Sequence, residues 1–402
     1  LSPEEDEGMV YPHSLFGSLL KEKGYKVTGG ALERRISLDL PSFVQEEFEV
    51  ERKRFEVANE LLSKKSWDVF MLHVQGTDGI QHCFYPFLDP NSPDFDRDKF
   101  NVVSDFYSNL DREIGALFSN LPKDEIKLIV SDHGFKQLKR YMNLNAWLRE
   151  EKFLTPQGMN LKAKIVELIR KYDVFRLRKR VFARLLSNFI SLREIITEVN
   201  TPSIDWEKTK AFMPNGTIYG GIFFGDEVEN KDQLAKDLTI KLSEFIDDEK
   251  EKSPIKNIFA REDTYSGPFL NLLPELLLQP SEGYSFGVPM VEEKNIFRDV
   301  EYPYDYLGTH EREGIMVING PGINSEREID AHITDVSPTI LALMGLDVPG
   351  YMDGKVREEM FNYDLDYEIK KTPLPVNKER GQESSAGDSE QVKERLEDLV
   401  YL

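Results

Sequence analysis

The chain has 402 residues, enough for one large domain with an insertion or for two domains, and its 51 basic and 72 acidic residues give a net charge of −21. This charge excludes binding to duplex nucleic acid through a broadly basic surface, and no run of about 18 apolar residues marks a membrane span. The single cysteine, Cys83, excludes a disulfide framework and a cysteine-rich zinc site, and it fits the reducing cytoplasm, where we expect the chain to be.

Helices and strands alternate in the first part of the chain. A helix is predicted over 43–64, and the nearly continuous apolar run 67–74 after it favours a strand that is buried on both faces. The next helix, over 97–119, keeps apolar residues at three- and four-residue spacing, and 126–130 predicts a second strand. This order indicates an α/β fold with a mostly parallel central sheet between helix layers.

Residues 150–300 are less regular and predict an inserted cap. A strand is predicted at 218–224 and a helix at 232–247. Within this part, 162–193 has ten basic and two acidic residues. Two interpretations stay open for it: a cap helix with a solvated face, and a weak contact with an anionic surface or a polyanionic substrate.

The α/β pattern returns after the insertion. A strand is predicted at 314–320, and a helix follows from Thr334 until Gly345 ends it. The predicted division is a catalytic α/β core in two halves, 1–149 and 301–362, an inserted cap, 150–300, and a polar linker with a C-terminal helix, 363–402.

Residues that can hold metal ions lie beside three of the predicted strands. Asp78 and His82 follow the first strand, and a helical turn there places both side chains on one face. Asp132 and His133 end the second strand, and His310 precedes the strand after the insertion. Carboxylates mixed with imidazoles are ligands of Zn²⁺, and two such groups allow two metal ions. Helix capping, half-buried histidines and a simple turn are the structural alternatives.

The order of these motifs resembles the type I phosphodiesterase/nucleotide pyrophosphatase family of the alkaline phosphatase superfamily. The segments that carry the resemblance are Thr77-Asp78 with His82, Ser131-Asp132-His133-Gly134, Gly308 with His310, and Ile333 to Gly345 with Pro349 and Gly354. The resemblance implies an alkaline phosphatase-like α/β fold and a hydrolase that cleaves phosphodiester or pyrophosphate bonds of nucleotide-type or related substrates. The expected partner is therefore a small phosphate ester.

The resemblance also implies a site with two divalent metal ions, for which we expect Zn²⁺, with Mn²⁺ or Fe²⁺ as alternatives. One ion would be held by Asp78, His82 and His310. Asp132 and His133 would share the other with one further Asp and with a Thr or Ser nucleophile. The implied mechanism is in-line displacement by that hydroxyl between two metal ions.

The part of the family pattern that carries the nucleophile has no counterpart before Asp78. We therefore expect on the order of a hundred or more residues upstream of Leu1, because the first strands of the βα layout are missing. We expect no catalytic nucleophile in this chain and no activity of this chain alone. Phosphomonoesterase, phosphonate hydrolase, sulfatase and phosphomutase activities of the same superfamily, and a non-catalytic metal-binding relative, are the alternatives.

Overall fold

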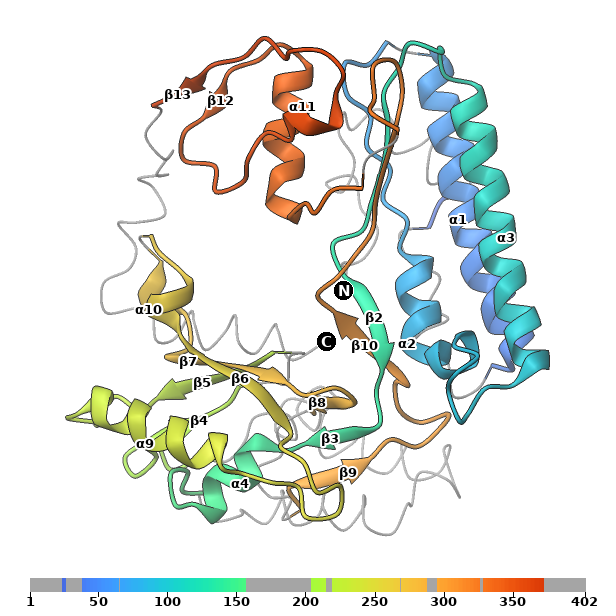
Figure 1. Ribbon diagram of the computed structural model, residues 1–402. Coiled ribbons are helices and arrows are strands. Elements are labelled where there is room, and N and C mark those ends of the chain that lie inside the picture. Colours follow the sequence, from blue (N-terminus) through green and yellow to red (C-terminus); the bar gives the residue numbers. More distant parts are fainter. Residues whose placement is uncertain are drawn as a thin grey trace, which may run out of the picture. The chain divides into compact units, whose positions relative to one another are not determined.

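The structure is a computed structural model that describes residues 24–26, 38–64, 66–156, 204–214, 219–267, 269–287, 295–325 and 328–371 (Figure 1). It contains two compact units. Ser2–Gln137 and Glu301–Gly381 belong to one, here named the site unit, and Leu138–Val300 belong to the other, here named the second unit. The predicted basic segment 162–193 and the predicted C-terminal helix lie outside the described residues. The division into core, cap and tail stays a prediction.

The helices of the site unit follow the apolar spacing of the sequence. They are α1 (Leu40–Lys64), α2 (Gly76–Leu88), α3 (Arg97–Ser119) and α11 (Val336–Leu343), with the 3-10 turns η4 (Ile333–Asp335) and η5 (Glu358–Met360). The bounds of α3 are those predicted, and α1 and α3 lie side by side (Figure 1). Their buried residues include Phe43, Phe55, Val103 and Phe106, so this pair of helices supplies much of the core of the site unit.

The strands of the site unit pair in three short ladders. β1 (Lys127–Val130) is antiparallel to β11 (Met316–Asn319), β2 (Gly134–Gln137) is antiparallel to β10 (Gly308–Glu311), and β12 (Val348–Pro349) is parallel to β13 (Ile369–Lys370). The ladder between β2 and β10 is the one that matters for the candidate site, because it joins the Asp-His motif to His310. Its register places His310 directly opposite Phe135.

The second unit packs helices against two small sheets. One has the order β8 (Tyr284–Phe286), β3 (Arg140–Met142), β9 (Phe297–Asp299), and the other has the order β4 (Ala211–Phe212), β5 (Gly220–Phe224), β7 (Leu276–Pro280), β6 (Ile255–Ala260). The helices are α4 (Leu144–Glu150), α9 (Lys231–Ser243) and α10 (Arg261–Thr264), with the turn η3 (Leu270–Leu272). The strand predicted at 218–224 and the helix predicted at 232–247 are present as β5 and α9. Across the described ranges of both units, no helix is long and apolar enough to cross a membrane.

The described residues have the mixed α/β content that the sequence predicts, but they do not confirm a mostly parallel central sheet. Six of their eight strand pairs are antiparallel, and their sheets have two to four strands. The strand predicted at 67–74 is wrong, because 66–75 contains no strand and Met71 is 87% exposed. An apolar run becomes a strand only where a neighbour takes up its backbone hydrogen bonds, and no described strand pairs with this run.

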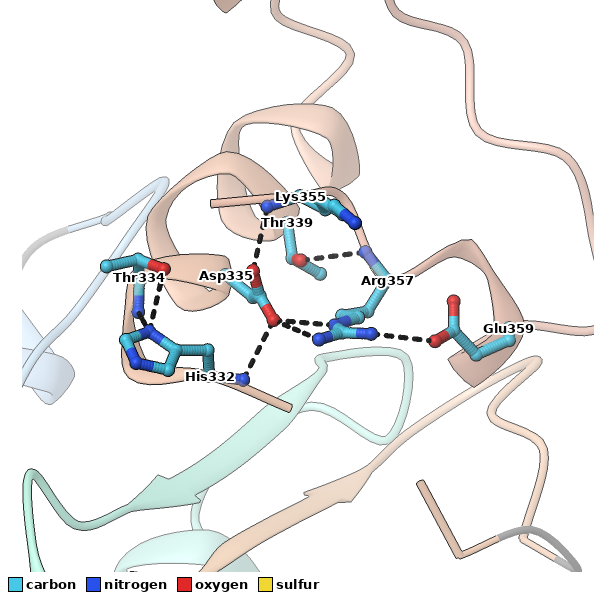
Figure 2. Close-up of polar contacts among 7 residues, drawn as sticks. All are labelled: His332, Thr334, Asp335, Thr339, Lys355, Arg357 and Glu359. Atoms are coloured by element: carbon cyan, nitrogen blue, oxygen red, sulfur yellow. Dashed lines mark hydrogen bonds and ion pairs between the residues drawn. The ribbon is translucent and has the colours of Figure 1, made fainter. Parts of the chain in front are cut away.

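A buried carboxylate ties the start of α11 to the loop that follows β12 (Figure 2). Asp335 Oδ1 accepts a hydrogen bond from the backbone N–H of Lys355 at 2.8 Å. Asp335 Oδ2 accepts from the backbone N–H of His332 at 2.8 Å and from Arg357 Nε at 2.7 Å. The Asp335 carboxylate therefore joins segments that are about twenty residues apart in the chain. The helix α11 itself ends at Gly345, with φ +66°, as predicted.

Replacing Asp335 with asparagine should reduce the loss in the free energy of unfolding that occurs as the pH falls from 7 to 3. Burial raises the pKa of Asp335, but the N–H groups of Lys355 and His332 and the Arg357 guanidinium outweigh it, so the pKa lies below its usual 3.8. A depressed folded-state pKa contributes stability that is present above 3.8 and is lost as the pH falls through the folded value. Urea unfolding at pH 7 and pH 3 measures this loss, which Asp335→Asn should reduce. The exposed Asp330→Asn is the control, and an equal loss in wild type and Asp335→Asn would contradict the assignment.

Candidate metal centre

The helix α2 carries Asp78 and His82 one turn apart, as their spacing predicts. Pro86 lies inside the same helix and has no N–H, so the carbonyl oxygen of His82 has no helical partner. The backbone N–H of Leu307 donates to that oxygen at 2.7 Å, and His82 Nδ1 lies 3.0 Å from the carbonyl oxygen of Gly308. The backbone carbonyl group and the imidazole of His82 therefore both bind the segment that leads directly into His310.

Glycines allow the segments around these histidines to approach closely. A Cβ atom on Gly308 would lie 2.2 Å from the backbone oxygen of Gln81, so only glycine lets β10 lie this close to α2. A Cβ atom on Gly134 would lie 2.0 Å from the backbone oxygen of Glu313. Each distance is far below van der Waals contact, and the obstacle is backbone in both cases. The glycines of the two motifs are therefore required by the packing around the site.

Three imidazoles surround one carboxylate oxygen. Asp78 Oδ1 lies 3.3 Å from Nε2 of His310, 3.6 Å from Nε2 of His82 and 3.8 Å from Nε2 of His133. The Nε2 atoms of His82 and His310 are 3.0 Å apart, and the rings of His133 and His310 stack with their centroids at 3.6 Å. The ligand atoms of Asp78, His133 and His310 all lie within 4.8 Å of one another, which is close enough for one ion to contact them.

Lone pairs converge in this cluster. Asp78 Oδ1 is buried and has no hydrogen-bond partner among the residues that the structure describes. A carbonyl oxygen only accepts, so the contacts of His82 Nδ1 with Gly308 and of His133 Nδ1 with Gly134 at 3.1 Å place the ring hydrogen on Nδ1. In the neutral rings, Nε2 then presents a lone pair toward the carboxylate. Facing lone pairs repel unless a proton or a metal ion lies among them, so the arrangement fits a bound metal ion as well as a proton shared between the Nε2 atoms of His82 and His310.

The protonation states suit metal ligation. Burial raises the pKa of Asp78, but interaction with the imidazoles of His310, His82 and His133 in their protonated forms lowers it by more, so the carboxyl group is ionised at neutral pH. Burial lowers the pKa of His82 and outweighs the attraction of the Asp78 carboxylate, so this imidazole is neutral at pH 7. Ionised carboxylate and neutral imidazole are the forms that bind metal ions.

Asp132 lies apart from this convergence. Its side chain is 84% exposed, and its Oδ1 atom lies 3.7 Å from Nε2 of His133. The family resemblance groups His133 with Asp132 and places Asp78, His82 and His310 in another set. The structure places His133 beside both sets, and it brings three of the five predicted residues, His82, His133 and His310, around the carboxylate of a fourth, Asp78.

Sequence reasoning missed two residues that support the cluster. Phe135 contacts all three imidazoles, and its position two residues after His133 in an extended segment is the signal that could have found it. Glu51 of α1 accepts hydrogen bonds from the backbone N–H groups of Gly76 and Gln75, at the start of the helix that carries Asp78. Nothing in the local sequence distinguishes Glu51 from the other acidic residues of α1.

The geometry defines a candidate metal centre built from carboxylate and imidazole groups in an α/β protein. The model of the family described as "Type I phosphodiesterase / nucleotide pyrophosphatase" matches residues 31–288, which is more than half of the chain. The chain therefore belongs to the type I phosphodiesterase / nucleotide pyrophosphatase family. The match includes Asp78, His82, Asp132 and His133, whereas His310 lies beyond it.

Two solved structures are similar to the chain. Human ectonucleotide pyrophosphatase / phosphodiesterase 5 is 14% identical, with 81% of this chain and 65% of that chain covered and a TM-score of 0.39. The murine protein of the same name is 12% identical, with 77% and 60% covered and a TM-score of 0.40. The chain thus spans less than two thirds of the length of either protein. None of the curated proteins compared with the chain matches it.

Proposed function

We propose that the protein to which this chain belongs hydrolyses phosphodiester or pyrophosphate bonds in nucleotide-type substrates, and that two divalent metal ions take part. The observation that carries the proposal is the approach of three imidazole Nε2 atoms to the buried Oδ1 atom of Asp78, which has no hydrogen-bond partner within the described ranges. Membership of the phosphodiesterase / pyrophosphatase family supports the class of reaction.

The donor set fits Zn²⁺ best, with Mn²⁺ or Fe²⁺ as alternatives, because it combines imidazole nitrogen with carboxylate oxygen. Asp78, His82 and His310 would hold one ion, and Asp132 and His133 would contribute to the other. When bound, such ions lower the pKa of an attacking hydroxyl or water and stabilise negative charge on the phosphoryl oxygens.

The chain's own residues prepare the ligands. The carbonyl oxygens of Gly308 and Gly134 orient two imidazoles with Nε2 directed at the Asp78 carboxylate, the usual role of hydrogen bonds behind metal-binding histidines. Of the hydroxyls next to the ligands, Ser131 Oγ accepts from the N–H of Ile315 at 2.8 Å, Thr309 is 2% exposed, and Thr77 is half-buried beside Asp78. We propose that the attacking Thr or Ser hydroxyl is supplied by residues outside this chain, because the part of the family pattern that carries it has no counterpart before Asp78.

Hydrolysis of bis(p-nitrophenyl) phosphate in the presence of Zn²⁺ tests the proposal. The 402-residue chain is compared with a version extended upstream of Leu1. The extended protein should hydrolyse the diester faster than p-nitrophenyl phosphate or p-nitrophenyl sulfate, and the 402-residue chain should give no turnover. Asp78→Asn in the extended protein should be inactive, while the exposed Asp330→Asn should match the wild type.

Each other outcome favours a different reading. A preference for the monoester or the sulfate would replace the proposal by a phosphomonoesterase or a sulfatase. Zinc binding by the extended protein with no turnover of any substrate would identify a non-catalytic metal-binding relative. Full activity of the 402-residue chain would show that its own residues supply the attacking hydroxyl.

A further inference from the structure

We propose that Phe135 is a positioning residue of the metal centre, which holds the imidazoles of His82, His133 and His310 in their mutual arrangement. The proposal rests on the function proposed above and adds a residue that belongs to no ligand set. It follows from the ladder between β2 and β10 and from the ring contacts of Phe135.

The strand geometry brings the rings together. Phe135 lies directly opposite His310 in the antiparallel ladder, and side chains of such a pair stand on the same face of the sheet. His133 directly precedes β2, two residues before Phe135, and its ring contacts that of Phe135. The helix α2 packs on β2 and β10, and it delivers His82 to the same place.

The ring contacts match this arrangement. The centroid of Phe135 lies 4.9 Å from that of His82, 5.1 Å from that of His310 and 5.3 Å from that of His133. The interplanar angles are 84° to His82 and 71° to His310, so these two pairs are edge-to-face, an arrangement that aromatic rings favour. By contrast, the ring contact of Tyr306 is with His82, and the centroids of these two rings are 4.6 Å apart.

An apolar aromatic ring suits this position. It has no hydrogen-bond donor or acceptor that could compete for Nε2, and its flat surface limits how each imidazole can rotate. A leucine of similar volume would fill the space but would leave the three rings free to turn. The ligands would then be organised only when the ion binds, which lowers affinity because the ordering cost is included in binding.

Zinc affinity of the 402-residue chain tests the proposal, with Phe135→Leu and Phe135→Met as the altered proteins and Phe135→Tyr as the conservative one. We expect the leucine and methionine variants to bind Zn²⁺ about 10- to 100-fold more weakly, the range found when groups behind metal ligands are lost. The tyrosine variant keeps the ring and should recover most of the affinity. Thermal unfolding of the metal-free proteins separates loss of affinity from loss of folding.

Histidine ring signals in the ¹H–¹³C NMR spectrum of the metal-free chain give a second readout. Phe135→Leu should shift or split the signals of three histidines, because three rings lose an aromatic neighbour. Tyr306→Leu should change the signals of His82, because the ring of Tyr306 contacts that imidazole. This measurement needs no bound ion, so it tests the role of Phe135 independently of zinc binding. A wild-type chain that fails to bind Zn²⁺ would contradict the metal centre itself. Wild-type zinc affinity with unchanged histidine signals in Phe135→Leu would overturn the proposal.

Discussion

Zinc binding by this chain is expected to fall by about a hundredfold when His310 is replaced with alanine. His310 Nε2 lies 3.0 Å from Nε2 of His82 and 3.3 Å from Oδ1 of Asp78, so its loss removes the group that is closest to both. Zinc sites with four ligands bind with about 10–16 kcal/mol, and a quarter of the lower value, about 2.5 kcal/mol, is nearly two orders of magnitude in affinity. Competition with a chromophoric chelator measures the change.

His332 provides the matched control. It is exposed, its Nδ1 atom lies 2.9 Å from Thr334 Oγ1, and it is not among the residues grouped around Asp78. His332→Ala should therefore bind Zn²⁺ as the wild type does. In the extended protein, His310→Ala should also reduce kcat/KM for the diester, whereas His332→Ala should not. If His310→Ala kept wild-type affinity, the ion would be bound by other groups and the assignment of the centre would fail.

Local spacing in the sequence was enough to predict several of the helices and part of the site. The bounds of α3 follow from its three- and four-residue apolar spacing, and the four-residue separation of Asp78 and His82 correctly placed both on one helical face. The strand predicted at 67–74 failed because an apolar run gives no information about its neighbours. A strand exists only as one member of a pair, and pairing is a long-range property.

Long-range register also explains what the sequence could not predict about the site. His133 stacks on His310, 177 positions later in the chain, because β2 pairs with β10 in one particular register. A shift of that register by one residue would turn these side chains to opposite faces. The local sequence indicates the role of Glu51 even less, since that role depends on a contact between α1 and the start of α2.

Replacing Glu51 with alanine is expected to destabilise the chain by about 3–5 kcal/mol, the range for breaking a buried ion pair by removing one partner. Glu51 is 1% exposed, and its carboxylate contacts the guanidinium of the buried Arg54. Its Oε1 atom also accepts from the backbone N–H of Gly76 at 2.7 Å and of Gln75 at 3.2 Å. The side chain of Gln75 forms no cap, so Glu51 supplies the cap of α2 from another helix. Urea unfolding measures the loss.

Two further variants separate the charge from the cap. Glu51→Gln keeps an oxygen that can accept from the N–H groups of α2 but removes the negative charge, so it should lose less stability than Glu51→Ala. Glu49→Ala removes an exposed carboxylate that pairs with Arg52 on the same helix, and it should cost less than about 1 kcal/mol. Because α2 carries Asp78 and His82, Glu51→Ala should also weaken zinc binding, while Glu49→Ala should leave it unchanged. Equal stability of the two alanine variants would mean that α2 is held in place without Glu51.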